Sequence, residues 1–249
     1  MKNNNSKDFV LFKGERIEVK DGELCLPPEL KRFDEIVRLG TLTNLKKLYY
    51  KGMELKKIEY LDQLNNLESL VLHGSHHLKI ENIDNLRNLR TLDLTDSNIP
   101  EIENLENLRN LEILILGKPY EMGSNFITEI KGLENLVKLK ELDLQHNKIK
   151  EIKGLDALTN LKILSLSFNY VKKIEGLDNL VNLEQLYLDY NEITEIKDLK
   201  TLTNLKCLSL SNNGPFDSNS LKVIESMKER GIDVFDKDSD LTREEITNI

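Results

Sequence analysis

The sequence predicts an α/β repeat protein, in which short strands from successive repeats stack into one parallel sheet along a solenoid. Three observations support this fold class. Apolar residues recur with a period of 22 residues, they alternate with other residues over a short part of each period, and an Asn follows that part. The segment 139–160, LKELDLQHNKIKEIKGLDALTN, has all three features. We therefore expect each period to form one coil of the solenoid.

The spacing of apolar residues within this segment changes at Asn147. Leu142 and Leu144 alternate with polar neighbours, which is typical of a strand with one buried face. Beyond Asn147 the interval widens to three residues, from Ile149 to Leu158, and this favours a 3₁₀-like or extended return. A strand followed by such a return makes one closed coil.

The string LxxLxLxxNxIxxIxxLxxLxx resembles the leucine-rich repeat, in the short 22-residue subclass shared by internalins and the regulatory subunit of protein phosphatase-1. The pattern recurs from Leu45 to Asn204. The resemblance implies a right-handed solenoid with a parallel concave β-sheet, a convex side of 3₁₀ and irregular turns, and a cap at each end. It also implies that a partner binds on the concave face.

Residues 1–44 precede the repeats and are expected to form a disordered start and an N-terminal cap. Asp21-Gly22 favours a hairpin turn between strands at 16–19 and 23–26. Residues 29–39 have the apolar spacing of a helix. We expect this hairpin and helix to cover the apolar end of the first coil.

Eight repeats occupy residues 45–213. They begin at Leu45, Leu67, Leu89, Leu111, Leu139, Leu161, Leu183 and Leu205. The interval between Leu111 and Leu139 exceeds the others by six residues, and the extra residues lie near 117–126, where Pro119 and Gly123 indicate a loop. We expect this insertion to project from the rim of the sheet.

One position of the repeat is occupied by different residues in the two halves of the chain. It is Asn in the later repeats, at Asn125, Asn147, Asn169, Asn191 and Asn213, but Met53, Ser75 and Ser97 in the earlier ones. An amide can satisfy buried backbone groups in the bend after a strand, whereas Met has no amide. The first three coils are therefore predicted to be less regular.

Residues 214–249 are predicted to form a C-terminal cap and an acidic tail within the same continuous domain. Ser220 is the expected N-cap of a helix from Leu221 to Arg230, and Gly231 is expected to end it. Residues 232–235 predict a last strand that closes the sheet.

Composition narrows the partners that the chain could bind. The formal net charge of −8 argues against a nucleic acid or an anionic membrane. No run approaches the roughly 20 apolar residues that cross a bilayer, and the first residues lack the features of a signal peptide. Cys25 and Cys207 lie at opposite ends of the predicted solenoid, so we expect free thiols and a cytoplasmic location.

The sequence offers no strong candidate for chemistry. His73, His76 and His77 diverge in the predicted coil, so we expect no metal site there. Asp236, Asp238 and Asp240 resemble the start of an EF-hand loop, but Leu241 and Thr247 stand where that loop needs Gly and Glu. No nucleophile elbow, phosphate-binding Gly loop or paired CxxC occurs. We expect neither enzyme activity nor a cofactor.

The candidate binding residues lie between or just after the buried leucines of the strands, where side chains face the concave side. They combine apolar, aromatic and acidic groups: Tyr49, Ile113, Ile115, Asp143, His146, Ile163, Phe168, Tyr187, Asp189 and Tyr190. Grouped apolar residues on an exposed face suggest a binding patch. The alternative is that Ile and Tyr are present for their β-propensity alone.

Two further features accompany the patch. His146, Phe168 and Tyr190 occupy one position of three successive repeats and are expected to stack. Tyr120 and Phe126 in the insertion are candidate anchors for a partner, unless the insertion is a tolerated surface loop.

The predicted function is a protein-binding scaffold, monomeric by expectation, with a homodimer as the alternative. Two other functions remain open. The solenoid could self-associate as a structural protein, or it could be the regulatory subunit of an enzyme such as a phosphatase, as the resemblance implies.

Overall fold

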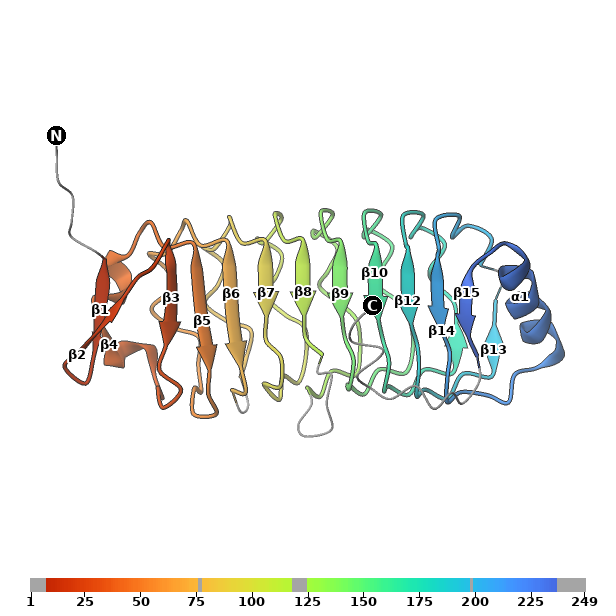
Figure 1. Ribbon diagram of the computed structural model, residues 1–249, viewed down its shortest axis with the longest axis horizontal. Coiled ribbons are helices and arrows are strands. Elements are labelled where there is room, and N and C mark those ends of the chain that lie inside the picture. Colours follow the sequence, from red (N-terminus) through yellow and green to blue (C-terminus); the bar gives the residue numbers. More distant parts are fainter. Residues whose placement is uncertain (1–7, 76–77, 118–124, 198, 237–249) are drawn as a thin grey trace.

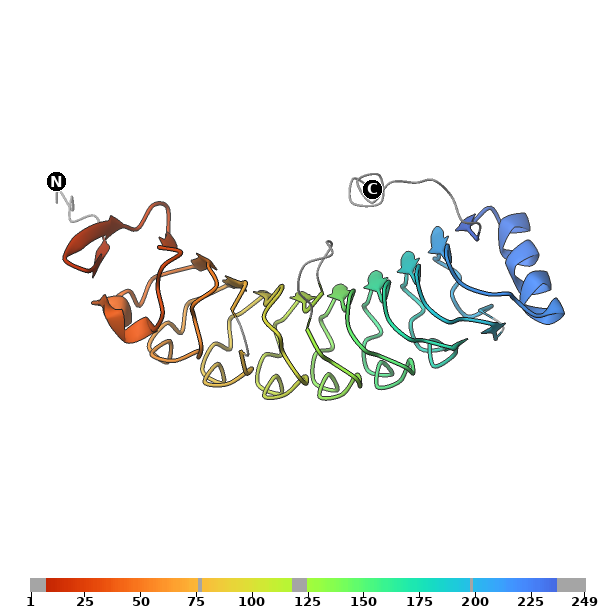
Figure 2. The same ribbon diagram turned by 90° about the horizontal axis from the view of Figure 1, so that it is seen from below.

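The computed structural model describes residues 8–75, 78–117, 125–197 and 199–236. They form an elongated, curved solenoid with a parallel sheet along its concave side (Figures 1 and 2). The sheet has ten strands in the order β15-β14-β12-β10-β9-β8-β7-β6-β5-β3. The predicted fold class is confirmed.

The strands are short because the chain leaves the sheet as soon as the apolar alternation ends. They are β3 (Glu23–Leu26), β5 (Lys47–Lys51), β6 (Ser69–His73), β7 (Thr91–Asp93), β8 (Ile113–Ile115), β9 (Glu141–Asp143), β10 (Ile163–Ser165), β12 (Gln185–Tyr187), β14 (Cys207–Ser209) and β15 (Asp233–Phe235). Each strand is parallel to its neighbours. The insertion after β8 leaves the register intact, since Ile113 lies beside Glu141.

The core is one continuous column of aliphatic side chains. The central leucine of each strand is aligned with the next and is fully buried: Leu48, Leu70, Leu92, Leu114, Leu142, Leu164, Leu186 and Leu208. On the convex side, successive i to i+3 turns bring the chain back. The N–H of Leu158 donates to the carbonyl of Leu155, and that of Leu161 to Leu158, both at 2.9 Å. A short convex pair, β11 (Lys173–Ile174) and β13 (Glu195–Ile196), joins two coils.

The repeated Asn ties each coil to the one before it. The Asn147 amide accepts from the N–H of Ile127 at 3.0 Å and donates to the carbonyls of Leu116 and Leu144 at 3.0 and 3.1 Å. Asn169, Asn191 and Asn213 repeat this pattern one coil further on each time. The side chain therefore satisfies buried backbone groups that the bend leaves without partners.

The first coils satisfy the same backbone groups by other means. Tyr50 is fully buried, and its hydroxyl accepts from the N–H groups of Glu54 and Leu55 at 3.1 and 3.2 Å. The same hydroxyl donates to the Leu30 carbonyl at 3.0 Å. A phenol thus replaces the amide that Met53 lacks. The Ser75 hydroxyl is buried without a hydrogen-bond partner in the described part of the chain.

A second series of Asn residues lies at the surface, before each strand. Asn66, Asn88, Asn110, Asn160, Asn182 and Asn204 each donate to a carbonyl of the previous coil at 2.8 or 2.9 Å. These amides are more accessible to water than the buried Asn residues. They link coils without closing a buried gap.

The N-terminal region differs from its prediction as a hairpin plus helix. The turn at Asp21-Gly22 is present and carries one antiparallel bridge, between Lys20 and Glu23. The two flanking strands then separate. β2 (Glu15–Glu18) pairs with β1 (Phe9–Phe12), which the sequence analysis missed, and β3 joins the long sheet beside β5.

The predicted helix at 29–39 is wrong. Two 3₁₀ turns, Phe33–Glu35 and Leu39–Thr41, stand there, separated by β4 (Ile36–Val37), which pairs with β1. Arg32 is extended and Arg38 has a φ of 76°, so a continuous helix cannot form. Leu30, Phe33, Ile36, Leu39 and Leu42 are buried at intervals of three residues, as in the repeats. This region is therefore a first coil of the solenoid.

The C-terminal helix, α1 (Ser218–Glu229), starts before its predicted position. Asp217, not Ser220, is the N-cap, and its carboxylate accepts from the N–H of Ser220 at 2.7 Å. The Ser220 hydroxyl instead accepts from the N–H of Ile196 at 2.8 Å, which joins the helix to the last coil. Gly231, with a φ of 79°, ends the helix as predicted. The last strand, β15, pairs with β14 (Figure 1).

We predict that Asn147→Ala lowers the free energy of unfolding by roughly 2–4 kcal/mol, because buried peptide groups lose their partners. Chemical denaturation measures this loss. Asn160→Ala is the matched control, because it removes a surface bond to Val137 and should cost about 1 kcal/mol. Equal losses in the two variants would contradict the role given to the buried amide.

Candidate binding face

Three columns of side chains lie on the concave side of the sheet, where they alternate with the buried leucines. The first is Lys47, Ser69, Thr91, Ile113, Glu141, Ile163, Gln185 and Cys207. The second is Tyr49, Val71, Asp93, Ile115, Asp143, Ser165, Tyr187 and Ser209. The strand register places the members of each column side by side. The third column lies at the last residue of β5 and β6 and just beyond the end of the later strands, at Lys51, His73, Thr95, Gly117, Gln145, Ser167, Asp189 and Ser211.

Five of the predicted binding residues lie together on adjacent strands. Ile113 and Ile115 are on β8, Asp143 on β9, Ile163 on β10 and Tyr187 on β12. All five side chains are partly buried, so each keeps part of its surface in contact with solvent. We call these four strands and their concave side chains the central face. Tyr49, on β5, is separated from it by β6 and β7 and stays outside.

Two carboxylates of the central face, Glu141 and Asp143, are partly buried on one strand. Burial raises the pKa of Glu141 above its ordinary value. Burial, together with the smaller effect of the charges of Glu141 and Asp93, raises the pKa of Asp143 to about 6, although the hydrogen bonds that it accepts from Gln145 act in the opposite direction. Those bonds, from the backbone N–H and the side-chain amide of Gln145, are 2.9 and 3.0 Å long. Both carboxylates therefore sit in surroundings that disfavour their charge.

Asp189, another predicted binding residue, is almost fully buried. It accepts hydrogen bonds from the hydroxyls of Ser209 and Ser167 and from the N–H of Ser211. Burial nevertheless raises its pKa. Because serines of the coil before it and the coil after it donate to its oxygens, Asp189 has a position that favours a structural role.

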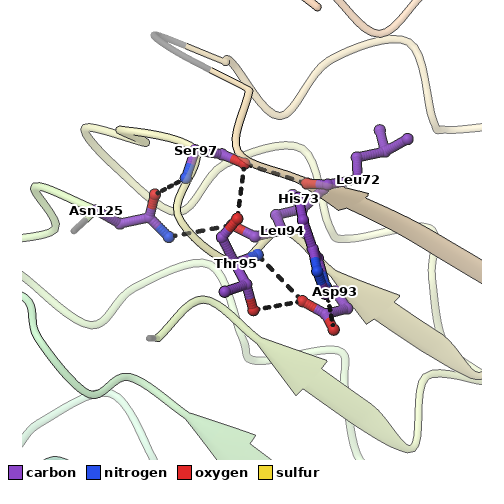
Figure 3. A network of polar contacts seen from close by, with 7 residues as sticks. All are labelled: Leu72, His73, Asp93, Leu94, Thr95, Ser97 and Asn125. Atoms are coloured by element: carbon purple, nitrogen blue, oxygen red, sulfur yellow. Dashed lines mark hydrogen bonds and ion pairs between the residues drawn. The ribbon is translucent and has the colours of Figure 1, made fainter. Parts of the chain in front are cut away.

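His73 and Asp93 form a pair that was not predicted from the sequence. Nε2 of His73 lies 2.7 Å from Oδ2 of Asp93, whose other oxygen accepts from the N–H and hydroxyl of Thr95 (Figure 3). Burial raises the pKa of Asp93, but the bonds from His73 and Thr95 outweigh it, and the pKa falls overall. The signal available in the sequence was the repeat spacing, which places His73 in the third column and Asp93 in the second.

The same view shows how the polar contacts reach the core of the coil (Figure 3). The Ser97 hydroxyl donates to the carbonyl of Leu72 at 3.1 Å. The N–H of Ser97 donates to the Asn125 amide at 3.1 Å, which in turn donates to the Leu94 carbonyl at 3.3 Å. The Asp93 network is thus continuous with the backbone that supports β7.

The predicted stack of His146, Phe168 and Tyr190 is present at the C-terminal ends of the strands. The ring centroids are 4.1 Å apart between His146 and Phe168 and 4.2 Å apart between Phe168 and Tyr190. The planes deviate by 9° and 10°. Each residue has a φ between 51° and 58°, which L-residues disfavour, so the stacking offsets backbone strain. The ring of Phe168 is therefore covered on both faces by its neighbours.

The opposite ends of the strands carry a row of ion pairs. Lys46 pairs with Glu68, Arg90 and Lys140 both pair with Glu112, and Lys162 and Lys206 both pair with Glu184. Hydrogen bonds from Lys206 and Lys162 lower the pKa of Glu184 to about 2. We call this row the charged rim. Its acids are neutralised by cations, unlike those of the central face.

The insertion is described only at its ends. Tyr120 lies outside the described residues, so its predicted role is untested. Phe126 is exposed, and the ammonium of Lys148 lies 4.4 Å from its ring centroid. Phe126 therefore has a partner within the chain and belongs to the coil beside the stack.

The remaining candidate features are the histidine and aspartate clusters and the helices. His76, His77, Asp238 and Asp240 lie outside the described residues. Within the ranges that the structure covers, no group of His, Cys, Asp and Glu could hold a metal ion. The helices of those ranges include none with the length and apolar character of a membrane span.

Comparison with known proteins supports the repeat assignment. The family model described as Leucine Rich repeats (2 copies) matches residues 121–157, 137–179 and 181–223. A search of curated proteins finds no match. Several solved structures are similar to this chain, and three of them illustrate the range.

An internalin (inlF) of Listeria monocytogenes is 26% identical, with a TM-score of 0.65, over 82% of this chain and 57% of its own. Internalin C2 of the same species is 27% identical, with a TM-score of 0.58, over 81% and 84%. A leucine-rich-repeat protein of Leptospira interrogans, 24% identical with a TM-score of 0.70, covers 86% of this chain and 54% of its own and supports the fold alone. This chain thus spans little more than half of two of these proteins.

We predict that Asp143→Asn stabilises the protein at neutral pH. The raised pKa means that the native state takes up a proton at higher pH than the unfolded state, so wild-type stability rises as pH falls from about 7 to about 5. Asparagine removes the buried charge, for a gain of roughly 2 kcal/mol at pH 7.5 that shrinks toward pH 4. Urea denaturation across this pH range measures it.

Glu184→Gln on the charged rim is the control with the opposite sign. The lowered pKa of Glu184 means that its ion pairs stabilise the native state above about pH 4.5 and lose this effect as pH falls toward 2. The glutamine variant should therefore be less stable than wild type at pH 7. A pH-independent effect of Asp143→Asn would contradict the burial argument.

We predict that Phe168→Ala lowers the free energy of unfolding by about 1–3 kcal/mol, because the central ring stacks on both neighbours. Tyr170→Ala removes an exposed ring that lies outside the stack. It should change the free energy of unfolding by less than about 1 kcal/mol. Chemical denaturation compares the two variants. Equal effects would show that the stack adds nothing beyond surface burial.

Proposed function

Because this chain is a leucine-rich-repeat protein with repeats of about 22 residues, we propose that it is a scaffold that binds a protein partner on the central face. Solenoids of this kind generally act as interaction scaffolds, and their curvature creates extended concave surfaces. The observation that carries the proposal is the group of partly exposed apolar side chains on β8, β10 and β12: Ile113, Ile115, Ile163 and Tyr187.

Pre-organisation is the proposed mechanism. The contact residues stand on strands whose backbone is tied to both neighbouring strands and, through the buried Asn series, to the next coil. A partner therefore loses little entropy in ordering this side of the interface. The Tyr187 hydroxyl donates to Gln185 at 3.2 Å, which orients the ring that we assign as an anchor.

Tyr49 and the stacked rim residues enter the proposal differently. Tyr49 lies too far along the sheet to share a small partner with Tyr187, so it would contact only a long one. His146, Phe168 and Tyr190 stack beside the strand ends of the central face and would form its border, with Tyr190 as the exposed ring of the three. Asp189 supports the border from within.

The rest of the proposal concerns location and assembly. The two cysteines are free thiols, as a reducing compartment favours, and we propose a cytoplasmic location on that ground. We propose a monomer. Self-association would instead give a mass that rises with protein concentration, and a regulatory subunit would change the rate of an enzyme that co-purifies with it.

We predict that a variant carrying Ile115→Thr, Ile163→Thr and Tyr187→Ala loses a partner that wild type captures from lysate of the source organism. Threonine keeps the β-branch, so the strands should still form. Loss of two or more anchor contacts should lower recovery by more than tenfold. Quantitative mass spectrometry of the captured proteins measures this.

The matched control carries Val137→Thr, Val181→Thr and Tyr60→Ala, which remove exposed apolar groups outside the sheet. This variant should recover the same proteins as wild type. If the central-face variant recovers the same set as wild type, the proposed face is wrong.

A further inference from the structure

The charges of this chain are arranged in two opposite ways on neighbouring surfaces. On the charged rim, Glu68, Glu112 and Glu184 each contact one or two cations, and the pKa of each is lowered. On the central face, the pKa values of Glu141 and Asp143 are raised instead. Lysines and an arginine pair with the rim acids, whereas no lysine of the described ranges pairs with Glu141 or Asp143.

The partners of Glu141 and Asp143 confirm this contrast. In the described ranges, Glu141 has no ion pair and no side-chain hydrogen bond, and Asp143 accepts hydrogen bonds only from Gln145, a neutral residue of the same segment. Neither carboxylate contacts a Lys, Arg or His among those residues. We call these two the carboxylate pair. Their desolvation is not offset by any cation within the described chain.

Apolar side chains frame the carboxylate pair. In the strand register Glu141 lies between Ile113 and Ile163, and Asp143 lies between Ile115 and Ser165. Adjacent strands are about 4.8 Å apart, so each carboxylate is in contact range of the side chains on both sides. Two negative groups thus stand within an aliphatic surface that faces away from the core.

The backbone beside the pair is shaped around Asp143. A Cβ atom at Gly117 would lie 2.2 Å from Oδ1 of Asp143, so only glycine leaves room for the carboxylate. The chain therefore accommodates this buried charge at the end of β8.

Ser165 is a second, independent sign of an incomplete site. Its side chain is on the concave face, directly beside Asp143 in the register, and the residue is 6% exposed. Its Oγ has no hydrogen-bond partner among the residues that the structure describes. A buried hydroxyl without a partner is unfavourable, and a polar group brought by a ligand would supply the missing hydrogen bond.

We propose that the protein partner inserts a lysine or arginine side chain onto the carboxylate pair, with its aliphatic part packed against Ile113, Ile115 and Ile163. Long basic side chains combine an apolar stem with a charged end, which is the combination that this surface complements. The cation would neutralise Glu141 and Asp143, and its N–H groups would lie within reach of Ser165. This inference rests on the proposed function and names the partner's chemistry at the same face.

The test is selection from a displayed random peptide library on the full-length protein at neutral pH and physiological ionic strength, with a metal chelator present. We expect the enriched peptides to share a Lys or Arg flanked by apolar residues. Replacing that residue by norleucine should weaken binding about 10- to 100-fold, as measured by fluorescence anisotropy.

A double variant, Glu141→Gln with Asp143→Asn, supplies the reciprocal measurement. It should lose a similar factor for the basic peptide and show little further loss with the norleucine peptide, because the two changes remove one interaction. The matched control is Glu225→Gln with Glu229→Gln on α1, which changes the net charge equally through exposed side chains. This control should bind like wild type.

The outcomes separate this inference from the proposed function. The selected peptides could lose binding to the Ile115, Ile163 and Tyr187 variant and yet carry no basic residue, or bind the double variant as well as wild type. Either result overturns the inference and leaves the central face as a binding surface. Peptides that are indifferent to both variants, or no enrichment at all, count against both. A calcium-dependent interaction, found by repeating the selection with calcium in place of chelator and abolished by the double variant, would make the pair a cation site and overturn the inference.

Discussion

The structure depends on one requirement, that every backbone polar group turned inward at the end of a strand finds a partner. A coil of about 22 residues must bend sharply after only three to five residues of strand, and the bend points several peptide groups at an aliphatic core. The Asn amide meets this requirement by bonding to two coils at once. The same side chain that closes one bend therefore also sets the spacing to the next coil.

Much of this architecture could be predicted from the sequence, since it follows from a repeated pattern. The alternation of Leu142 and Leu144 and the 22-residue period determine which side chains share a column. The residues of the concave face could therefore be assigned from the sequence alone. The first coil was missed because apolar residues three apart occur in helices as well as in irregular coils, and only the φ of Arg38 decides between them. The Tyr50 hydroxyl was missed because its role depends on backbone groups that a distant turn leaves open.

The candidate site was predictable in position but not in character. Register alone places Ile113, Glu141 and Ile163 in one row. Whether a carboxylate in that row is solvated or buried depends on how far its neighbours cover it, and on the bare backbone at Gly117, which only coordinates can provide. The stacked rings were predictable for the same reason as the columns, whereas the left-handed backbone beneath them was not.

The lengths of the strands have a mechanical consequence. The strands run across the long axis of the solenoid, so a pull along that axis would load the bonds between neighbouring strands one pair after another (Figure 1). β5 and β6 pair over five residues, but β7, β8, β9, β10, β12 and β14 each have only three. Backbone bonds just outside these short strands, such as the one from the N–H of Leu144 to the carbonyl of Ser165, add to the links between the coils of the central face. A ligand that bridges several of those strands would act there as a splint.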